Sequence, residues 1–502
     1  MIRFMMFILF LIPLATILIA KLFQMRKKDI IGWNCMVEPS KKDYILFAVV
    51  SLICYVSFGF GDIFITATHG NNFISAILNG DILGFYDYST RPDADFAELF
   101  EAGTPAYLLP SYILFGIWSI PVRIIYFITD TPLWGPFDFD YVRGELLLWY
   151  KLLPTLFYFG TAKVIFMICE LINIEKKRAK WVVFIYLASP FAIYSQFIFS
   201  QYDSIYIFFM TLAIYYFLKK KLYTFIIMMA IAMTFKSFPI FVVIPLILLV
   251  EKRVIHIAKY ILISVSGYFA FTVPFLGSEA FVVASGFRTI MIDRVLMMGL
   301  PLQRGGTVSL FVVVFAVICS YMYVKKVEQD EERYTLTIYV TAMIFVLLFS
   351  VTFWHPQWML AMVPFIAIII VSSEKMKVSF YAYLFCNIVF ILLTPLKFPH
   401  SVDAGLVNSG ILVNIFNHTL SDATLTHRFS LNGAITTATY TSIFVAMLLI
   451  ILLHNIPTKK NIANIAEIKV QEFTLERELI WSLVLTVGIY VVPVYYMFFR
   501  GL

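Results

Sequence analysis

Residues 203–250 read DSIYIFFMTLAIYYFLKKKLYTFIIMMAIAMTFKSFPIFVVIPLILLV and contain three apolar runs separated by two short polar interruptions. The first interruption is Lys219-Lys220-Lys221, and the second is Lys236-Ser237. A helix that crosses the hydrocarbon core of a membrane needs about 20 predominantly apolar residues. The three runs approach that length, and the polar residues between them are too few to form anything but tight turns. This stretch therefore predicts three consecutive helical crossings.

The rest of the chain has the same character. Of its 502 residues, 61% are hydrophobic and only 14% are charged, and the mean hydropathy is +0.87. Soluble domains have about 25% charged residues, so the composition excludes a soluble enzyme, a disordered protein and a nucleic-acid binder. It predicts an all-α polytopic membrane protein with about fourteen transmembrane helices. The predicted spans lie near 2–20, 44–62, 146–171, 181–198, 203–218, 222–236, 238–250, 257–276, 307–324, 334–353, 358–373, 378–396, 435–454 and 479–499.

The basic residues predict the orientation of these spans. With this layout, most of the 38 Lys and Arg residues fall in loops on one side, which the positive-inside rule places in the cytoplasm. Both termini are then predicted outside, in the plasma membrane of a bacterium. The apolar run 2–20 is predicted to be a retained span, because its basic cluster follows it, whereas that of a signal peptide precedes the apolar region. The proline-broken stretch 105–128 is predicted to be a helix on, or dipping into, the outer leaflet.

This layout divides the chain into three parts. Residues 1–43 form an extra N-terminal span and a basic cytoplasmic loop, 44–375 form a transmembrane core, and 376–502 form a C-terminal transmembrane region. External loops are predicted at 63–145, within the core, and at 397–434. The first is long, rich in aromatic residues and carries ten acidic residues, and loops of this length are usually functional or disordered. We interpret it as ordered and functional.

Two charged residues stand at predicted outer helix ends. Asp62 ends the second span, and charges near membrane depth are functional candidates by default, although a solvated helix-end acid is an equal alternative. Lys236 is a cation on the side that positive charge avoids. It needs an anionic partner or a path to water, and a lipid headgroup and a bound phosphate are the alternatives. The external segment 277–306 carries Arg288, an arginine on the same unusual side, suited to phosphate contacts.

Two short external turns are rich in polar side chains. Ser200-Gln201-Tyr202-Asp203-Ser204 could simply cap helices, with Ser200 or Asp203 as N-cap residue. Trp354-His355-Pro356-Gln357-Trp358 could be part of an aromatic belt. A belt does not require the histidine and the glutamine, which supply hydrogen-bonding groups.

Evidence for a metal site is limited to two DxD patterns. Paired acids can hold a divalent cation through their oxygen atoms, but this pattern is common by chance, so a divalent cofactor is an open alternative. The chain has no glycine-rich phosphate loop and no Rossmann motif, which disfavours an enzyme that uses a nucleotide. The candidate metal ligands are Asp93, Asp95, Asp138 and Asp140.

Taken together, residues 44–375 resemble the GT-C superfamily of membrane glycosyltransferases, which use polyprenyl-phosphate sugars. In that superfamily an acidic residue follows the first core span, here Gly61-Asp62, and a long external loop with membrane-surface helices comes next. The turn at 200–204 is similar to the Gln-containing turn of dolichyl-phosphate-dependent glucosyl- and mannosyltransferases. Lys236 and the turn at 355–358 match later motifs of bacterial members. The chain lacks the acidic pair that several mannosyltransferases carry after the first core span, which leaves the sugar and any metal requirement open.

The resemblance implies an inverting transfer of a hexose-type sugar from a polyprenyl-monophosphate donor to a glycan or lipid-linked acceptor on the outer face. Asp62 would then be the base for the acceptor hydroxyl. Lys236, His355 and Arg288 would contact the phosphate, and Gln201, Asp203 and Gln357 would position the sugar or those cations. His69 and Asp81, in the external loop, are further candidates for contact with acceptor or donor. Protein partners cannot be predicted from these motifs.

Two rival functions remain open. A flippase or exporter of lipid-linked oligosaccharides would also have about fourteen spans. Transporters, however, usually place charges near the bilayer midplane, whereas the unusual charges here gather at outer helix ends, with Lys163 as an exception. A polysaccharide polymerase or O-antigen ligase would share the outer site but use a diphosphate donor.

Overall fold

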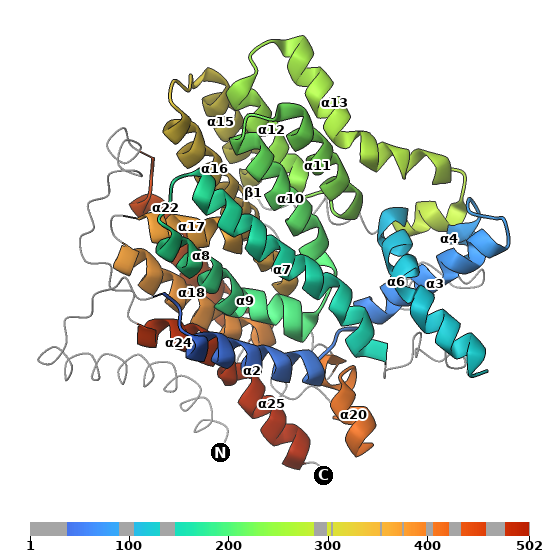
Figure 1. The fold of residues 1–502 in the computed structure, drawn as a ribbon. Helices are drawn as coiled ribbons and strands as arrows, with labels where there is room; N and C mark the ends of the chain where they lie inside the picture. Colours follow the sequence, from blue (N-terminus) through green and yellow to red (C-terminus); the bar gives the residue numbers. More distant parts are fainter. Residues whose placement is uncertain are drawn as a thin grey trace, which may run out of the picture.

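The computed structural model describes residues 38–89, 105–130, 146–285, 299–302, 305–351, 354–373, 376–397, 405–420, 433–457 and 477–500. In these ranges the chain is almost entirely helical (Figure 1). The strands described are β1 (Gly299–Pro301) and β2 (Thr307–Ser309), which form a small antiparallel pair. The described residues are thus all-α apart from this strand pair, as predicted, and the long apolar helices among them fit a membrane-embedded protein.

The helices before residue 240 are α2 (Lys41–Ser57), α3 (Gly61–Leu78), α4 (Phe85–Ser89), α6 (Leu109–Ile128), α7 (Leu147–Leu171), α8 (Lys176–Ala188), α9 (Pro190–Ile193), the π-helix η2 (Tyr194–Phe199), α10 (Asp203–Leu218), α11 (Leu222–Phe235) and α12 (Pro239–Val250). Those that follow are α13 (Val254–Ala270), η3 (Val273–Phe275), α15 (Leu310–Val324), α16 (Asp330–Val351), η4 (Pro356–Met362), α17 (Val363–Ser372), α18 (Met376–Lys397), α20 (Ile411–Phe416), α22 (Gly433–His454), α24 (Arg477–Thr486) and α25 (Gly488–Arg500).

In the part of the chain that the structure describes, fewer helices are long and apolar enough to cross a membrane than the fourteen spans that the sequence predicts. Six helices of the described residues are long and apolar enough to cross a membrane, or eight if each of two bent helix pairs counts as one span. Most other predicted spans coincide with apolar helices of 10–17 residues, such as α11 and α12. The predicted span at 2–20 lies outside the described residues, and fourteen spans are not confirmed.

The predicted span 44–62 differs most from the structure. Helix α2 ends at Ser57, and α3 begins at Gly61 after a bend of 68°. Phe58 and Phe60 are extended at the break, and the amide of Gly59 donates to the carbonyl of Leu406 at 2.9 Å. A Cβ atom on Gly59 would lie 3.0 Å from the side chain of Leu147. Packing against distant residues therefore sets the break, and the start of the predicted loop 63–145 is helical.

The second bent pair lies in the predicted span 181–198. Helix α8 is followed, after a bend of 48°, by α9 and η2. The π-helix ends at Phe199, and its C-cap residue, Ser200, has a left-handed backbone with φ of 61°. A π-turn inserts an extra residue into a helix and is frequently found at functional sites. Here the π-helix and the left-handed Ser200 change the direction of the backbone just before Gln201.

Helices α3, α4 and α6 form a group at the right of Figure 1, beside the larger bundle. Within it α3 and α6 approach closely, because Gly70 and Gly116 face each other; a Cβ atom on Gly116 would lie 2.7 Å from the carbonyl oxygen of Gly70. Arg123 of α6 donates to the carbonyl oxygen of Asn71 at 2.9 Å. Most of the proline-broken stretch 105–128 is thus a helix fixed to α3. Its predicted place on the outer leaflet is not confirmed, because α6 is one of the six described helices that are long and apolar enough to cross a membrane.

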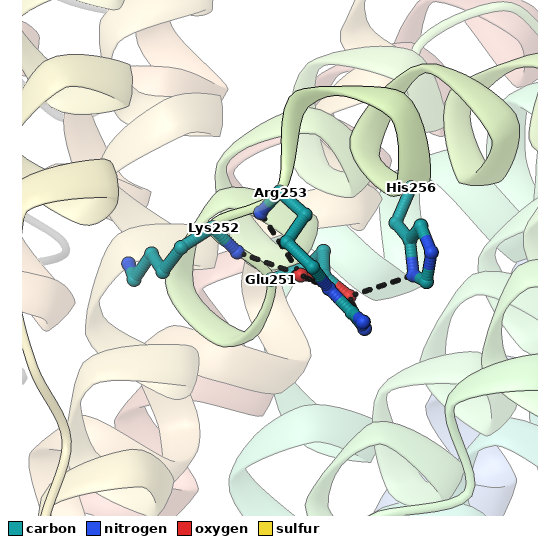
Figure 2. Close-up of polar contacts among 4 residues, drawn as sticks. All are labelled: Glu251, Lys252, Arg253 and His256. Atoms are coloured by element: carbon teal, nitrogen blue, oxygen red, sulfur yellow. Dashed lines mark hydrogen bonds and ion pairs between the residues drawn. The ribbon is translucent and has the colours of Figure 1, made fainter.

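A polar turn joins α12 to α13 (Figure 2). The Glu251 carboxylate accepts two hydrogen bonds of 3.1 Å from the Arg253 guanidinium and lies 3.4 Å from the His256 ring nitrogen. The bonds from Arg253 lower the pKa of Glu251 to about 2. Lys252 points away from this group, and its ammonium donates to the carbonyl oxygen of Met322, at 3.1 Å, at the end of α15.

Candidate functional site

The site is built around Asp62, the second residue of α3, immediately after the break. Its Oδ2 atom accepts hydrogen bonds from the Gln201 amide nitrogen at 2.6 Å and from the Tyr107 hydroxyl at 3.3 Å. Gln201 lies between η2 and α10, and Tyr107 precedes α6. Three segments that are distant in the sequence therefore meet at one carboxylate. Burial raises the pKa of Tyr107 well above its ordinary value, so its hydroxyl keeps the proton that it donates.

Gln201 connects this carboxylate to a fourth segment. Its amide nitrogen is also 2.6 Å from the Tyr107 hydroxyl, and its carbonyl oxygen accepts from the Gln357 amide nitrogen at 2.7 Å. Gln357 lies in η4 and is 4% exposed, and Gln201 is 3% exposed. An amide has one acceptor and two donor hydrogens, so these contacts fix the orientation of the Gln201 side chain.

A buried ion pair lies beside this network. The Lys236 ammonium is 2.9 Å from Oδ1 of Asp203, the first residue of α10. Its nitrogen is also 5.6 Å, 5.7 Å and 6.0 Å from the ring centroids of Tyr202, Trp358 and Tyr107, within the range of cation–π attraction. The cation that the sequence places on an unfavourable side thus has an anionic partner from its own chain. Tyr107 contacts both this pair and Asp62.

The helix-capping interpretation of the turn at 200–204 is not what the structure shows. The N-cap residue of α10 is Tyr202, and no side chain caps the helix. Ser200 donates back to the carbonyl oxygen of Gln196 at 3.0 Å, while Asp203 pairs with Lys236. Of the polar residues of this turn, Gln201 and Asp203 contact other residues of the site.

The second turn also differs from an aromatic belt. Trp354 is fully buried and stacks near Phe390 and Phe444, with ring centroids 6.0 Å and 5.6 Å away. His355 packs its ring against Trp358 at 5.2 Å, which places it next to the aromatic side chains around the ion pair. The turn is therefore part of the interior of the protein.

The remaining sequence candidates lie elsewhere or outside the described residues. His69, two turns after Asp62 in α3, is buried and packs edge-on against Tyr112 at 5.5 Å. Asp81 is exposed, and its carboxylate accepts from the Gly84 amide at 2.9 Å, which stabilises its own turn. Among the residues that the structure describes, no group of three or more His, Cys, Asp or Glu side chains is placed to hold a metal. Arg288, Asp93, Asp95, Asp138 and Asp140 lie outside the described residues.

Tyr107 is the site residue that sequence reasoning missed. Its partners are 45 and 94 residues away, and tyrosine is one of the common residues of this chain. No local pattern distinguishes it from the other aromatic residues of the segment 63–145.

The site also contains buried polar atoms that have no hydrogen-bond partner in the described part of the chain. Among these are the carbonyl oxygen of Gln357, the indole nitrogen of Trp358 and the hydroxyl of Tyr206. Buried polar groups are normally hydrogen-bonded, so atoms of this kind beside a carboxylate and an ammonium are suited to a polar ligand. No family model, curated protein or solved structure matches the chain.

Proposed function

We propose that the protein is an inverting glycosyltransferase that moves a hexose-type sugar from a polyprenyl-monophosphate donor to an acceptor on the outer face of the membrane. One observation carries this proposal. Candidates chosen from separate positions in the sequence, Asp62, Gln201, Asp203, Lys236 and Gln357, lie together in one network linked by hydrogen bonds, an ion pair and aromatic contacts.

Asp62 is suited to act as the general base. Both of its described hydrogen bonds engage Oδ2, so Oδ1 is the atom that would take the proton of the acceptor hydroxyl. The acceptor oxygen attacks the anomeric carbon, the bond from that carbon to the phosphate oxygen breaks, and its electron pair leaves with the lipid phosphate. A base held by two donors keeps its position through this step.

Lys236 is suited to stabilise the departing phosphate. Its ammonium is within reach of a ligand that approaches Asp62, because Tyr107 contacts both residues. Electrostatic stabilisation of this kind is strongest where protein excludes water, and the Lys236 side chain is only 15% exposed. Asp203 then holds the ammonium in place between turnovers. His355 contacts the ring of Trp358, which in turn lies next to the ammonium.

The sugar would be held by the unpartnered polar atoms of the site. The carbonyl oxygen of Gln357 can accept from a sugar hydroxyl, and the indole nitrogen of Trp358 can donate to one. The rings of Tyr202 and Trp358 offer apolar faces for the sugar carbons. Arg288, the further candidate for contact with the phosphate, lies outside the described residues.

The test is sugar release from a panel of polyprenyl-phosphate sugars by the purified full-length protein in lipid nanodiscs. Asp62→Asn is expected to lower turnover by about 10²- to 10⁴-fold, the range for loss of a general base. The matched control is Asp330→Asn, which changes a half-exposed carboxylate paired with Lys220, and it should leave turnover unchanged. Equal turnover in wild type and Asp62→Asn would remove Asp62 from the mechanism.

Two other results would favour the rival functions. Release only from diphosphate donors would indicate a polymerase or ligase. Silence on every donor, with lipid-linked glycan crossing reconstituted vesicles, would indicate a transporter.

A further inference from the structure

Lys151 is a fully buried lysine in the middle of the fold that the proposed chemistry does not use. It lies in the first turns of α7 and is 0% exposed. Its ammonium donates to the carbonyl oxygens of Tyr55 at 2.5 Å, Phe58 at 2.6 Å and Phe197 at 2.9 Å. A lysine ammonium has three donor hydrogens, so these three acceptors satisfy it completely.

The charge of Lys151 is balanced by backbone groups. No carboxylate of the described residues forms an ion pair with it. Two of its acceptors belong to the end of α2, and the third belongs to the end of η2. The last carbonyl groups of a helix carry a partial negative charge and lack partners within the helix. Lys151 therefore supplies the positive charge and the donors that two converging helix ends require, and the ring of Tyr55 lies 4.7 Å from its nitrogen.

The two helix ends that Lys151 joins are those that carry the site. Phe58 comes four residues before Asp62, and Phe197 comes four residues before Gln201. Asp62 and Gln201 make the central hydrogen bond of the site, at 2.6 Å. One ammonium thus contacts the backbone four residues before each of the two partners of that bond.

We infer that Lys151 is a positioning residue, which ties the break after α2 to the end of η2 and so keeps Asp62 and Gln201 in contact. Its effect on turnover rests on the proposed function, whereas its effect on the two backbone segments does not. Without the ammonium, the three carbonyl oxygens lose their donor, and the segments 58–62 and 197–201 separate. A displacement of about 1 Å in a catalytic group can cost on the order of 100-fold in rate.

The test compares full-length wild type with Lys151→Met in nanodiscs by hydrogen–deuterium exchange and by steady-state turnover. Lys163→Met is the matched control, because Lys163 lies in the same helix but is exposed. We expect faster exchange in both segments of Lys151→Met, a fall in kcat on the order of 100-fold, and KM within about a factor of two of wild type. Lys163→Met should match wild type in all three. Lys151→Gln, which keeps a shorter donor, should fall between wild type and Lys151→Met, and it replaces the methionine variant if that variant does not fold.

The outcomes separate this inference from the proposed function. Unchanged exchange in both segments, or a change in only one of them, would overturn the inference whatever the turnover. A KM increase with unchanged kcat would also overturn it, because a loss of base positioning acts on the chemical step. If Lys151→Met exchanges faster in both segments but the wild-type protein turns over no donor, the role of Lys151 in holding the two segments is supported and the proposed glycosyltransferase activity is refuted.

Discussion

The substitution Gln201→Leu tests whether the site depends on a single side chain. It removes two hydrogen bonds donated to Asp62 and Tyr107 and one accepted from Gln357. A neutral hydrogen bond contributes about 1 kcal/mol to stability, and one to a charged group about 1.5–3 kcal/mol. Because Asp62 is partly exposed and water can replace part of its bond, we expect a loss of about 3 kcal/mol in the free energy of unfolding.

The matched control is Gln196→Leu, since Gln196 is a buried glutamine five residues earlier. It is 1% exposed, and its amide donates one bond of 3.1 Å to Thr155. Its carbonyl oxygen has no hydrogen-bond partner among the described residues, so leucine removes one bond and one unsatisfied acceptor. We expect this control to cost at most about 1 kcal/mol.

The assays are denaturant titration of both variants in detergent micelles and turnover in nanodiscs. Gln201→Leu should lower turnover on the order of 100-fold, because Asp62 and Gln357 lose the group that orients them. Gln196→Leu should keep turnover within about a factor of two. Equal losses of stability and turnover in the two variants would refute the reasoning, since the effect would then come from burying leucine in this segment.

Two further substitutions probe the ion pair and the helix contact that support the site. Lys236→Met leaves the carboxylate of Asp203, which is 1% exposed, without its cation, and should lower the free energy of unfolding by about 3 kcal/mol. Adding Asp203→Asn should restore part of that stability but no turnover. A double variant that is no more stable than Lys236→Met would contradict the pairing. Gly70→Ala places a Cβ atom 2.7 Å from the amide nitrogen of Gly116 and should destabilise by about 1–3 kcal/mol, whereas Gly61→Ala, with nothing within 4 Å of its Cβ position, should be neutral or slightly stabilising in the same unfolding titration.

The helices could be predicted from the sequence because the length of an apolar run is a local property. The predicted runs 146–171 and 378–396 coincide closely with α7 (Leu147–Leu171) and α18 (Met376–Lys397). The break between α2 and α3 could not be predicted in this way. It depends on Leu406 and Leu147, which contact Gly59 from other parts of the chain, and an apolar run reads the same whether or not its backbone is bent.

Site residues could be found where their chemistry contrasts with the surrounding sequence. Asp62 and Lys236 stand out because charges at the ends of apolar helices are unusual in a chain with few charged residues. Tyr107 does not, in a sequence with 29 tyrosines. The two lysines of α7 show what the sequence cannot predict. Lys163, which the sequence marks as an unusual charge within a span, is exposed, whereas Lys151 is buried. The partners that decide between them lie on other helices.

The backbone tie at Lys151 has a consequence for biosynthesis. Phe58 precedes its donor by 93 residues, and Phe197 follows that donor by 46. In a nascent chain, the carbonyl groups of Tyr55 and Phe58 therefore have no donor from Lys151 until α7 has been synthesised. Lys151 in turn lacks its third acceptor until η2 has been synthesised. Until α7 has been translated, these carbonyl groups depend on water or on other protein groups for their hydrogen bonds. The polar contacts of this region are therefore complete only after residue 197 has joined the fold.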